Sequence, residues 1–105
     1  MLENGVDVTY HAFDRIKERV GLSKQAAIRL ANKAFCNGIT HKELTGGVLK
    51  FADHMYLSHK KANNIRIYGE FMWLFHDNVL ITVVDLPNEY KKSVKQIYKK
   101  RDRYQ

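Results

Sequence analysis

The sequence predicts an α+β domain in which N-terminal helices pack on a small antiparallel β-meander and a basic helix follows. Apolar residues recur at helical spacing over residues 10–36, which predicts two amphipathic helices. β-branched and aromatic residues dominate residues 64–86, which predicts strands. The chain of 105 residues fits a single domain (1–105), with its core in 8–87 and the basic helix in 88–105.

The first helix is expected over residues 10–20. Thr9 is suited to cap its amino end, and Gly21 is suited to the left-handed backbone that often follows a helix. We expect its core face to consist of Phe13, Ile16 and Val20. A separate row of His11, Arg15 and Arg19 recurs every four residues along the flank of that face. The row fits a solvated helix flank. It also fits a functional cationic row, which gains weight because Asp14 and Glu18 fall one position aside and nothing acidic on the helix neutralises the row.

The middle of the chain continues as helices joined by a loop. Residues 22–36 are rich in alanine and apolar over a broad arc, so this helix should pack closely against the first helix and the sheet. Its Cys36 is the sole cysteine and is expected to be buried, which leaves no disulfide and no cysteine-based zinc site. A polar loop is predicted over 39–47, and residues 48–60 fit either a third helix or a strand hairpin.

The meander of residues 64–86 contains two turn pairs, Gly69-Glu70 and Asp77-Asn78, which suit two-residue hairpins. Counting outward from these turns places Tyr68 opposite Phe71, Arg66 opposite Trp73, and Trp73 opposite Thr82. Alternation then gives two unlike faces. The aliphatic face, expected to lie on the helices, carries Ile65, Ile67, Met72, Leu74, Ile81 and Val83. The mixed face, a functional surface or a second core under the C-terminal helix, carries Arg66, Tyr68, Phe71, Trp73, Phe75, Leu80, Thr82 and Val84.

Charge indicates the class of partner. The formal net charge is +7, from 18 Lys and Arg against 11 Asp and Glu. Such an excess is typical of nucleic-acid binding, although an acidic protein surface is served equally well. The C-terminal helix is either a soluble helix that keeps its charges in water or a phosphate-binding surface. Its candidate binding residues are Lys91, Lys92, Lys95, Lys99, Lys100 and Arg101, to which Arg19, Tyr68 and Trp73 are added.

One set of residues suits metal-independent cleavage of RNA: His11, Arg15, Arg66 and Thr82. Such cleavage needs groups for proton transfer and fixed cations for the charge that builds on the phosphate. Histidine can transfer protons near neutral pH, arginines supply the cations, and Thr82 or Tyr68 can bond the phosphate. Trp73 can stack a base. RNA is therefore the expected polymer, in preference to DNA.

Two stretches, HAFDRIKERVGLS and ANNIRIYGEFMWLFHDNVLITVVDLP, carry a resemblance over residues 8–87. They resemble small proteins of unassigned function from phages and prophages of Gram-positive bacteria. The order of helices and meander is similar, more distantly, to the barnase, EndoU and RelE-like superfamily of metal-independent ribonucleases and toxins. That resemblance implies an active site at His11, Arg15, Arg66 and Thr82. It leaves two functions open: an endoribonuclease, or a non-catalytic phage inhibitor or modulator of a host protein or its nucleic acid.

Other classes of site lack their sequence patterns. No nucleotide-binding or hydrolase motif is present, His54 and His59 lack a metal-ligand spacing, and we expect neither a metal nor another cofactor. No apolar run is long enough for a membrane span and no signal peptide is recognised, so a cytoplasmic protein of a bacterial host is expected. Strand edges at Ile65 and Val79 leave a dimer possible, and the oligomeric state open.

Overall fold

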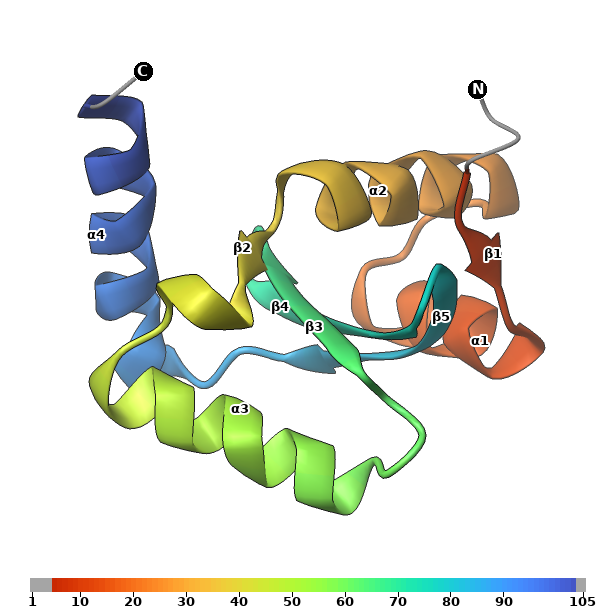
Figure 1. Cartoon of the computed structure of the whole chain (residues 1–105). Coiled ribbons are helices and arrows are strands. Elements are labelled where there is room, and N and C mark those ends of the chain that lie inside the picture. Colours follow the sequence, from red (N-terminus) through yellow and green to blue (C-terminus); the bar gives the residue numbers. More distant parts are fainter. Residues whose placement is uncertain (1–4, 104–105) are drawn as a thin grey trace.

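The computed structural model describes residues 5–103, in which five strands form a sheet with helices on both faces (Figure 1). The helices are α1 (Tyr10–Arg19), α2 (Lys24–Asn37), α3 (Gly46–Ser58) and α4 (Asn88–Arg103), with a 3₁₀ helix at His41–Glu43. The strands are β1 (Asp7–Val8), β2 (Ile39–Thr40), β3 (Asn64–Tyr68), β4 (Phe71–His76) and β5 (Val79–Asp85). The predicted α+β class is confirmed, and the sheet is larger than the three-stranded meander. Residues 104 and 105 of the predicted C-terminal helix lie outside the described residues.

The first helix begins at the predicted residue, and the second begins two residues later than expected, at Lys24. The Thr9 hydroxyl accepts a hydrogen bond from the Ala12 amide at 3.1 Å, and Ser23 does the same for Ala26 at 3.4 Å. Each bond satisfies one of the amides that a helix start leaves without a partner. Gly21 joins the two helices with φ +74°, a conformation that costs glycine nothing.

The meander has the predicted strands and the predicted turns. Arg66 pairs with Trp73 and Tyr68 with Phe71, as counting from the first turn requires. Asp77 has a φ of 53°, so the second turn uses the left-handed conformation that Asp tolerates. The register between β3 and β4 is therefore confirmed.

The predicted pairing of Trp73 with Thr82 is wrong, because β5 contains one extra residue. Phe75 pairs with Leu80, but the next pair is Leu74 with Thr82, so the register shifts at this bulge. Beyond it, Trp73 pairs with Val83, and the side chains from Thr82 onward exchange faces. The Thr9 hydroxyl lies 3.1 and 3.3 Å from the carbonyl oxygens of Leu80 and Ile81 at the bulge, and its single proton is shared between these two acceptors. Thr82 and Val84 thus leave the mixed face, and Val83 joins it.

Each edge of the meander is paired over two residues, and the expected free backbone groups at Ile65 and Val79 have partners. β1 runs parallel to β5, where Asp7 pairs with Val79, and β2 runs antiparallel to β3. The Ile65 amide donates to the hydroxyl of Tyr56 at 3.1 Å. The predicted loop of residues 39–47 is wrong in part, since it contains β2 and a 3₁₀ helix.

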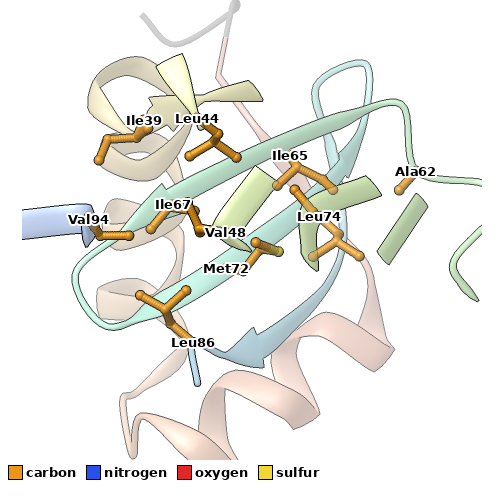
Figure 2. Packing of buried hydrophobic residues seen from close by; sticks show 11 residues of the cluster. Ile39, Leu44, Val48, Ala62, Ile65, Ile67, Met72, Leu74, Leu86 and Val94 are labelled. Atoms are coloured by element: carbon orange, nitrogen blue, oxygen red, sulfur yellow. The ribbon is translucent and has the colours of Figure 1, made fainter. Parts of the chain in front are cut away.

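The sheet separates two cores. The aliphatic face packs on α3, as the prediction that this face lies on helices requires, but α1 and α2 lie on the opposite face from the one expected. Helices α1 and α2 cover the mixed face, where Trp73 and Phe75 are fully buried in one core with Ala31 and Ala34. Small residues on α2 leave the volume that the large rings fill. The aliphatic face lies instead against α3 and α4 (Figure 2). The buried residues of the core between this face and the two helices are Ile39, Leu44, Val48, Ala52, Ala62, Ile65, Ile67, Met72, Leu74, Leu86 and Val94.

Two open points of the sequence are decided by this packing. Residues 48–60 are helical rather than a hairpin, since α3 spans Gly46–Ser58 and buries Val48 and Ala52. Cys36 is exposed, which makes its predicted burial wrong: it is two residues beyond buried Ala34 and so on another side of α2. In the part of the chain that the structure describes, no helix has the length and apolar character needed to span a membrane.

Candidate nucleic-acid interface

Two of the three residues in the cationic row of α1, Arg15 and Arg19, make contacts with other groups of the protein. The guanidinium of Arg15 donates to the carboxylate of Glu18, three residues on, at 2.6 Å. Arg19 donates to the backbone carbonyl of Val83 on β5. The inference that nothing acidic on the helix neutralises the row is therefore wrong for Arg15, because residues three apart are neighbours on a helix. His11 is exposed at the amino end of the row.

Arg66 holds the end of α2 against the sheet. Its Nη1 donates to the carbonyl of Phe35 at 2.5 Å, and its Nε donates to Asn64 at 2.9 Å. The guanidinium also lies 5.3 Å from the centre of the Phe35 ring, within the range of a cation–π contact. A helix leaves its last carbonyls without intrahelical partners, and Arg66 supplies one. Its donors are thereby directed into the protein.

The aromatic residue assigned to base stacking is inaccessible. Trp73 has no exposed surface, and its indole Nε1 donates to the Tyr68 carbonyl at 3.1 Å. Tyr68 is half-buried against the same core. Thr82 is 3% exposed and, after the bulge, pairs with Leu74 of the aliphatic core. The mixed face is a second core, as one sequence interpretation allowed, but α1 and α2 cover it rather than the C-terminal helix.

The four residues assigned to RNA cleavage consequently lie apart. The sheet itself separates Thr82 from α1, which carries His11 and Arg15 on the other face. Helix α1 packs along β5, whereas Arg66 belongs to β3, and β4 lies between these strands. Strands are about 4.8 Å apart, so two strand spacings amount to about 10 Å. The alanines of α2 were the signal for this covering, since they predicted close packing against the sheet.

Helix α4 is fixed at the β2 side of the sheet by one of its faces (Figure 1). Val94 is buried, and the hydroxyl of Tyr98 donates to the Ile67 carbonyl at 2.9 Å. Burial raises the pKa of Tyr98, so this hydroxyl keeps its proton to a higher pH than an exposed tyrosine does. Arg101 donates to the Asn37 carbonyl at 2.6 Å and to the Glu43 carboxylate at 2.6 Å. Arg101, assigned to nucleic-acid binding from the sequence, is thus part of the attachment of α4.

Glu43 is the residue of this region that the sequence interpretation missed. Its carboxylate accepts from the Thr40 amide at 3.0 Å as well as from Arg101. Burial by itself raises the pKa of Glu43, but the bonds from Thr40 and Arg101 outweigh it, and the pKa lies below its ordinary value. The spacing of Thr40 and Glu43 is that of a capping box and was the available signal.

The opposite face of α4 carries a row of exposed lysines. Lys92, Lys95 and Lys99 follow one another by three and four residues, so they share one side of the helix. Lys100 is exposed on the flank, beside a hollow of about 420 Å³ that Thr45, Ser93 and Gln96 also line. Lys91 differs, because it binds Glu70 at 3.2 Å. Four of the predicted binding lysines therefore lie together in solvent.

Among the described residues, two histidines lie beside an aspartate. His41 Nε2 lies 2.7 Å from Asp53 Oδ1, and His76 lies 3.7 Å from Asp77. Within residues 5–103, no three His, Cys, Asp or Glu side chains are grouped so that they could hold a metal ion. Among these residues, every buried side-chain nitrogen and oxygen also has a hydrogen-bond partner. The buried polar groups thus serve the fold.

Comparison with known protein families, with curated protein sequences and with solved structures found no significant match to this chain.

Proposed function

We propose that this protein binds nucleic acid through the exposed lysines of α4 and acts as a binding module rather than a nuclease. The observation that carries the proposal is the contrast within α4 itself. Arg101 and Lys91 are paired with carboxylates, whereas Lys92, Lys95, Lys99 and Lys100 have no ion pair among the described residues. Four ammonium groups on one exposed surface attract a polyanion.

The chemistry of phosphate binding suits such lysines. Each phosphate that a lysine neutralises releases condensed counterions, and this release favours binding strongly at low salt. The four lysines alone account for a slope of about −3.6 in a plot of the logarithm of the binding constant against that of salt. A salt dependence of this size is readily measured.

The separation of the candidate catalytic residues favours binding over cleavage. General acid–base catalysis requires the proton-transferring group and the charge-stabilising groups within hydrogen-bond reach of one substrate. His11 is exposed on α1, while Arg66 is engaged with α2 and Thr82 is buried on the far face of the sheet. A ribonuclease built from this set would need a large rearrangement of the core.

The test compares two variants with equal loss of charge. In the first, Lys92, Lys95, Lys99 and Lys100 are replaced by Gln. In the matched control, four exposed lysines elsewhere are replaced by Gln: Lys42, Lys50, Lys60 and Lys61. We expect the α4 variant to lose affinity for labelled RNA and DNA by on the order of a thousandfold near 0.1 M salt, and the control to lose far less. Equal losses in both variants would contradict a site on α4.

An acidic protein surface is the alternative partner for the same lysines, as part of a non-catalytic inhibitor of a host protein. Polyglutamate is a suitable competitor, because it has carboxylates but no phosphates. If nucleic acid is the partner, polyglutamate of equal charge should displace it poorly. Displacement at equal charge concentration would favour the acidic protein instead.

A further inference from the structure

We infer that the nucleic acid bound by α4 is double-stranded and is held by its phosphates without reading of the bases, an inference that rests on the proposed function. The sequence favoured RNA over DNA, with Trp73 as the residue that stacks a base. Burial of that ring removes the reason for this preference. The remaining question is which polymer the exposed surface of α4 suits.

Over residues 88–102, whose side chains the structure describes, the lysine face of α4 has no aromatic ring on which a base can stack. The Tyr90 ring faces inward, 5.5 Å from the centre of the Phe51 ring and directly over Gly47. Tyr98 faces inward as well and binds the Ile67 carbonyl. Proteins that bind single strands gain about 1–3 kcal/mol per base from stacking on aromatic side chains. A single strand on α4 would forgo this gain.

Among residues 88–102, groups that identify bases are also scarce on this face. Arginine is the commonest reader of guanine, but the donors of Arg101 are occupied by Asn37 and Glu43. Lysine is a flexible point charge that contacts phosphate without requiring a particular base. Among the described residues, Asn88 and Gln96 are exposed on this side of α4 and have amides that are able to read adenine. Gln96 lines the hollow beside Lys100, so it serves as the test position for base recognition.

The geometry of the row fits a rigid polyanion. Lys92 and Lys99 are seven residues apart on one helix, which corresponds to about 10 Å along its axis, with Lys95 between them. Helix α4 is held at both ends of this stretch, by Val94 in the core and by Arg101. The helix fixes the spacing of the lysines and the duplex fixes its dense phosphates, so the lysine side chains are the groups that lose freedom on binding. A flexible strand must lose conformational entropy in the same contact.

The phosphates of duplex DNA and of duplex RNA offer the same chemistry, so both are included in the experiment. Fluorescence anisotropy is measured with a labelled DNA duplex, an RNA duplex of equal length, and their separated strands. Each is prepared in two base compositions and titrated between about 50 and 200 mM salt. The proteins are the wild type and the variants Gln96→Ala and Tyr10→Ala. Tyr10 is the control because its ring is 87% exposed on α1, far along the chain from α4.

We expect both duplexes to bind about tenfold or more tightly than their single strands. We expect the two base compositions to bind equally, with neither Gln96→Ala nor Tyr10→Ala altering the preference for duplex. Single strands that bind as tightly as duplexes would overturn the inference while leaving the proposed function intact. A preference for one base composition that Gln96→Ala abolishes would also overturn it. Failure of all the polymers to bind at the lowest salt would overturn the proposed function itself.

Discussion

Helices α1 and α4 both carry a row of cations at helical spacing, but the two rows differ in what they contact. On α1, Arg15 binds Glu18 and Arg19 binds the Val83 carbonyl, so two of the three residues in the row already have partners within the protein. On α4, the row of Lys92, Lys95 and Lys99 lies opposite the docked face and remains in solvent. A cationic row in a sequence therefore indicates an external binding partner only when the folded protein leaves its charged groups without a contact inside the protein.

Arginines and lysines differ in the same way, since several arginines make contacts within the protein and the lysines of the α4 row stay in solvent. Arg19, Arg66 and Arg101 each donate to a backbone carbonyl, at a strand edge or a helix end that the hydrogen-bond ladders leave without a partner. The guanidinium suits this position because its planar fork of donors is weakly hydrated. The ammonium of lysine is strongly hydrated and stays in water at the end of its flexible stem.

The largest effect is expected at Trp73, which tests whether the mixed face is a core. Trp73→Ala should lower the free energy of unfolding by about 3–5 kcal/mol, because it empties a fully buried volume between α2 and the sheet. Urea denaturation measures the change, with Tyr10→Ala as the exposed aromatic control. Trp73 is the sole tryptophan, so its fluorescence reports this site directly. Quenching of that fluorescence by added nucleic acid would contradict the burial of Trp73 and support the prediction from the sequence that this ring stacks a base.

A smaller effect separates the two faces of α4. Arg101→Ala should lower the free energy of unfolding by about 1–3 kcal/mol, since it leaves the carboxylate of Glu43 and a helix-end carbonyl without their donor. Lys99→Ala removes the same charge from the exposed face and should change stability by about 0.5 kcal/mol or less. Thermal or urea unfolding of the two variants gives the comparison. Equal destabilisation would mean that the lysine row is also part of the fold.

The attachment of α4 is expected to weaken in acid. The pKa of Glu43 in the folded protein is below its ordinary value of 4.5, so its ionised form is the one that the fold stabilises. The contribution is complete above that ordinary value and is lost as the pH falls through the lower folded pKa. The Tm of wild type and of Glu43→Gln, followed from pH 7 downward, should converge below about pH 4.5. A difference that does not depend on pH would show that charge on Glu43 has no role.

The smallest effect is expected at His11. His11→Ala should leave duplex binding and stability almost unchanged, by about 0.5 kcal/mol or less, because the side chain is exposed on α1. Incubation of both proteins with labelled RNA in EDTA provides the measurement. Cleavage by the wild type that disappears in the variant would contradict the binding module and restore His11 as a catalytic group.

Much of the local structure could be predicted because local rules determine it. The caps at Thr9 and Ser23, the left-handed Gly21 and the turn at Asp77 each depend on a few neighbouring residues. The register between β3 and β4 followed from a two-residue turn in the same way. The candidate interface was predictable to the same extent, since the spacing of Lys92, Lys95 and Lys99 already places them on one side of a helix.

The sequence could not show whether the candidate catalytic residues meet, because their positions depend on the register of β5 and on the packing of α2 against the sheet. One extra residue in β5 moved Thr82 to the other face, and counting from the turn at Asp77 cannot detect a bulge further along the strand. The partners of Arg66 and Arg101 are backbone carbonyls at the end of α2, which become neighbours only when α2 lies on the sheet and α4 at its side.

The sequence by itself determined the class of the fold, the positions of the helices and the meander, and the surplus of positive charge, because composition and periodicity are local properties of a chain. Only the tertiary structure decided which face of the sheet each helix covers and which cations remain in solvent. Those outcomes depend on how volumes fit across the sheet and on which backbone carbonyls lack a donor once it forms. Alanines on α2 gave room for Trp73 and Phe75, and the lysines of α4 stayed exposed because Val94, Tyr98 and Arg101 occupy its other face.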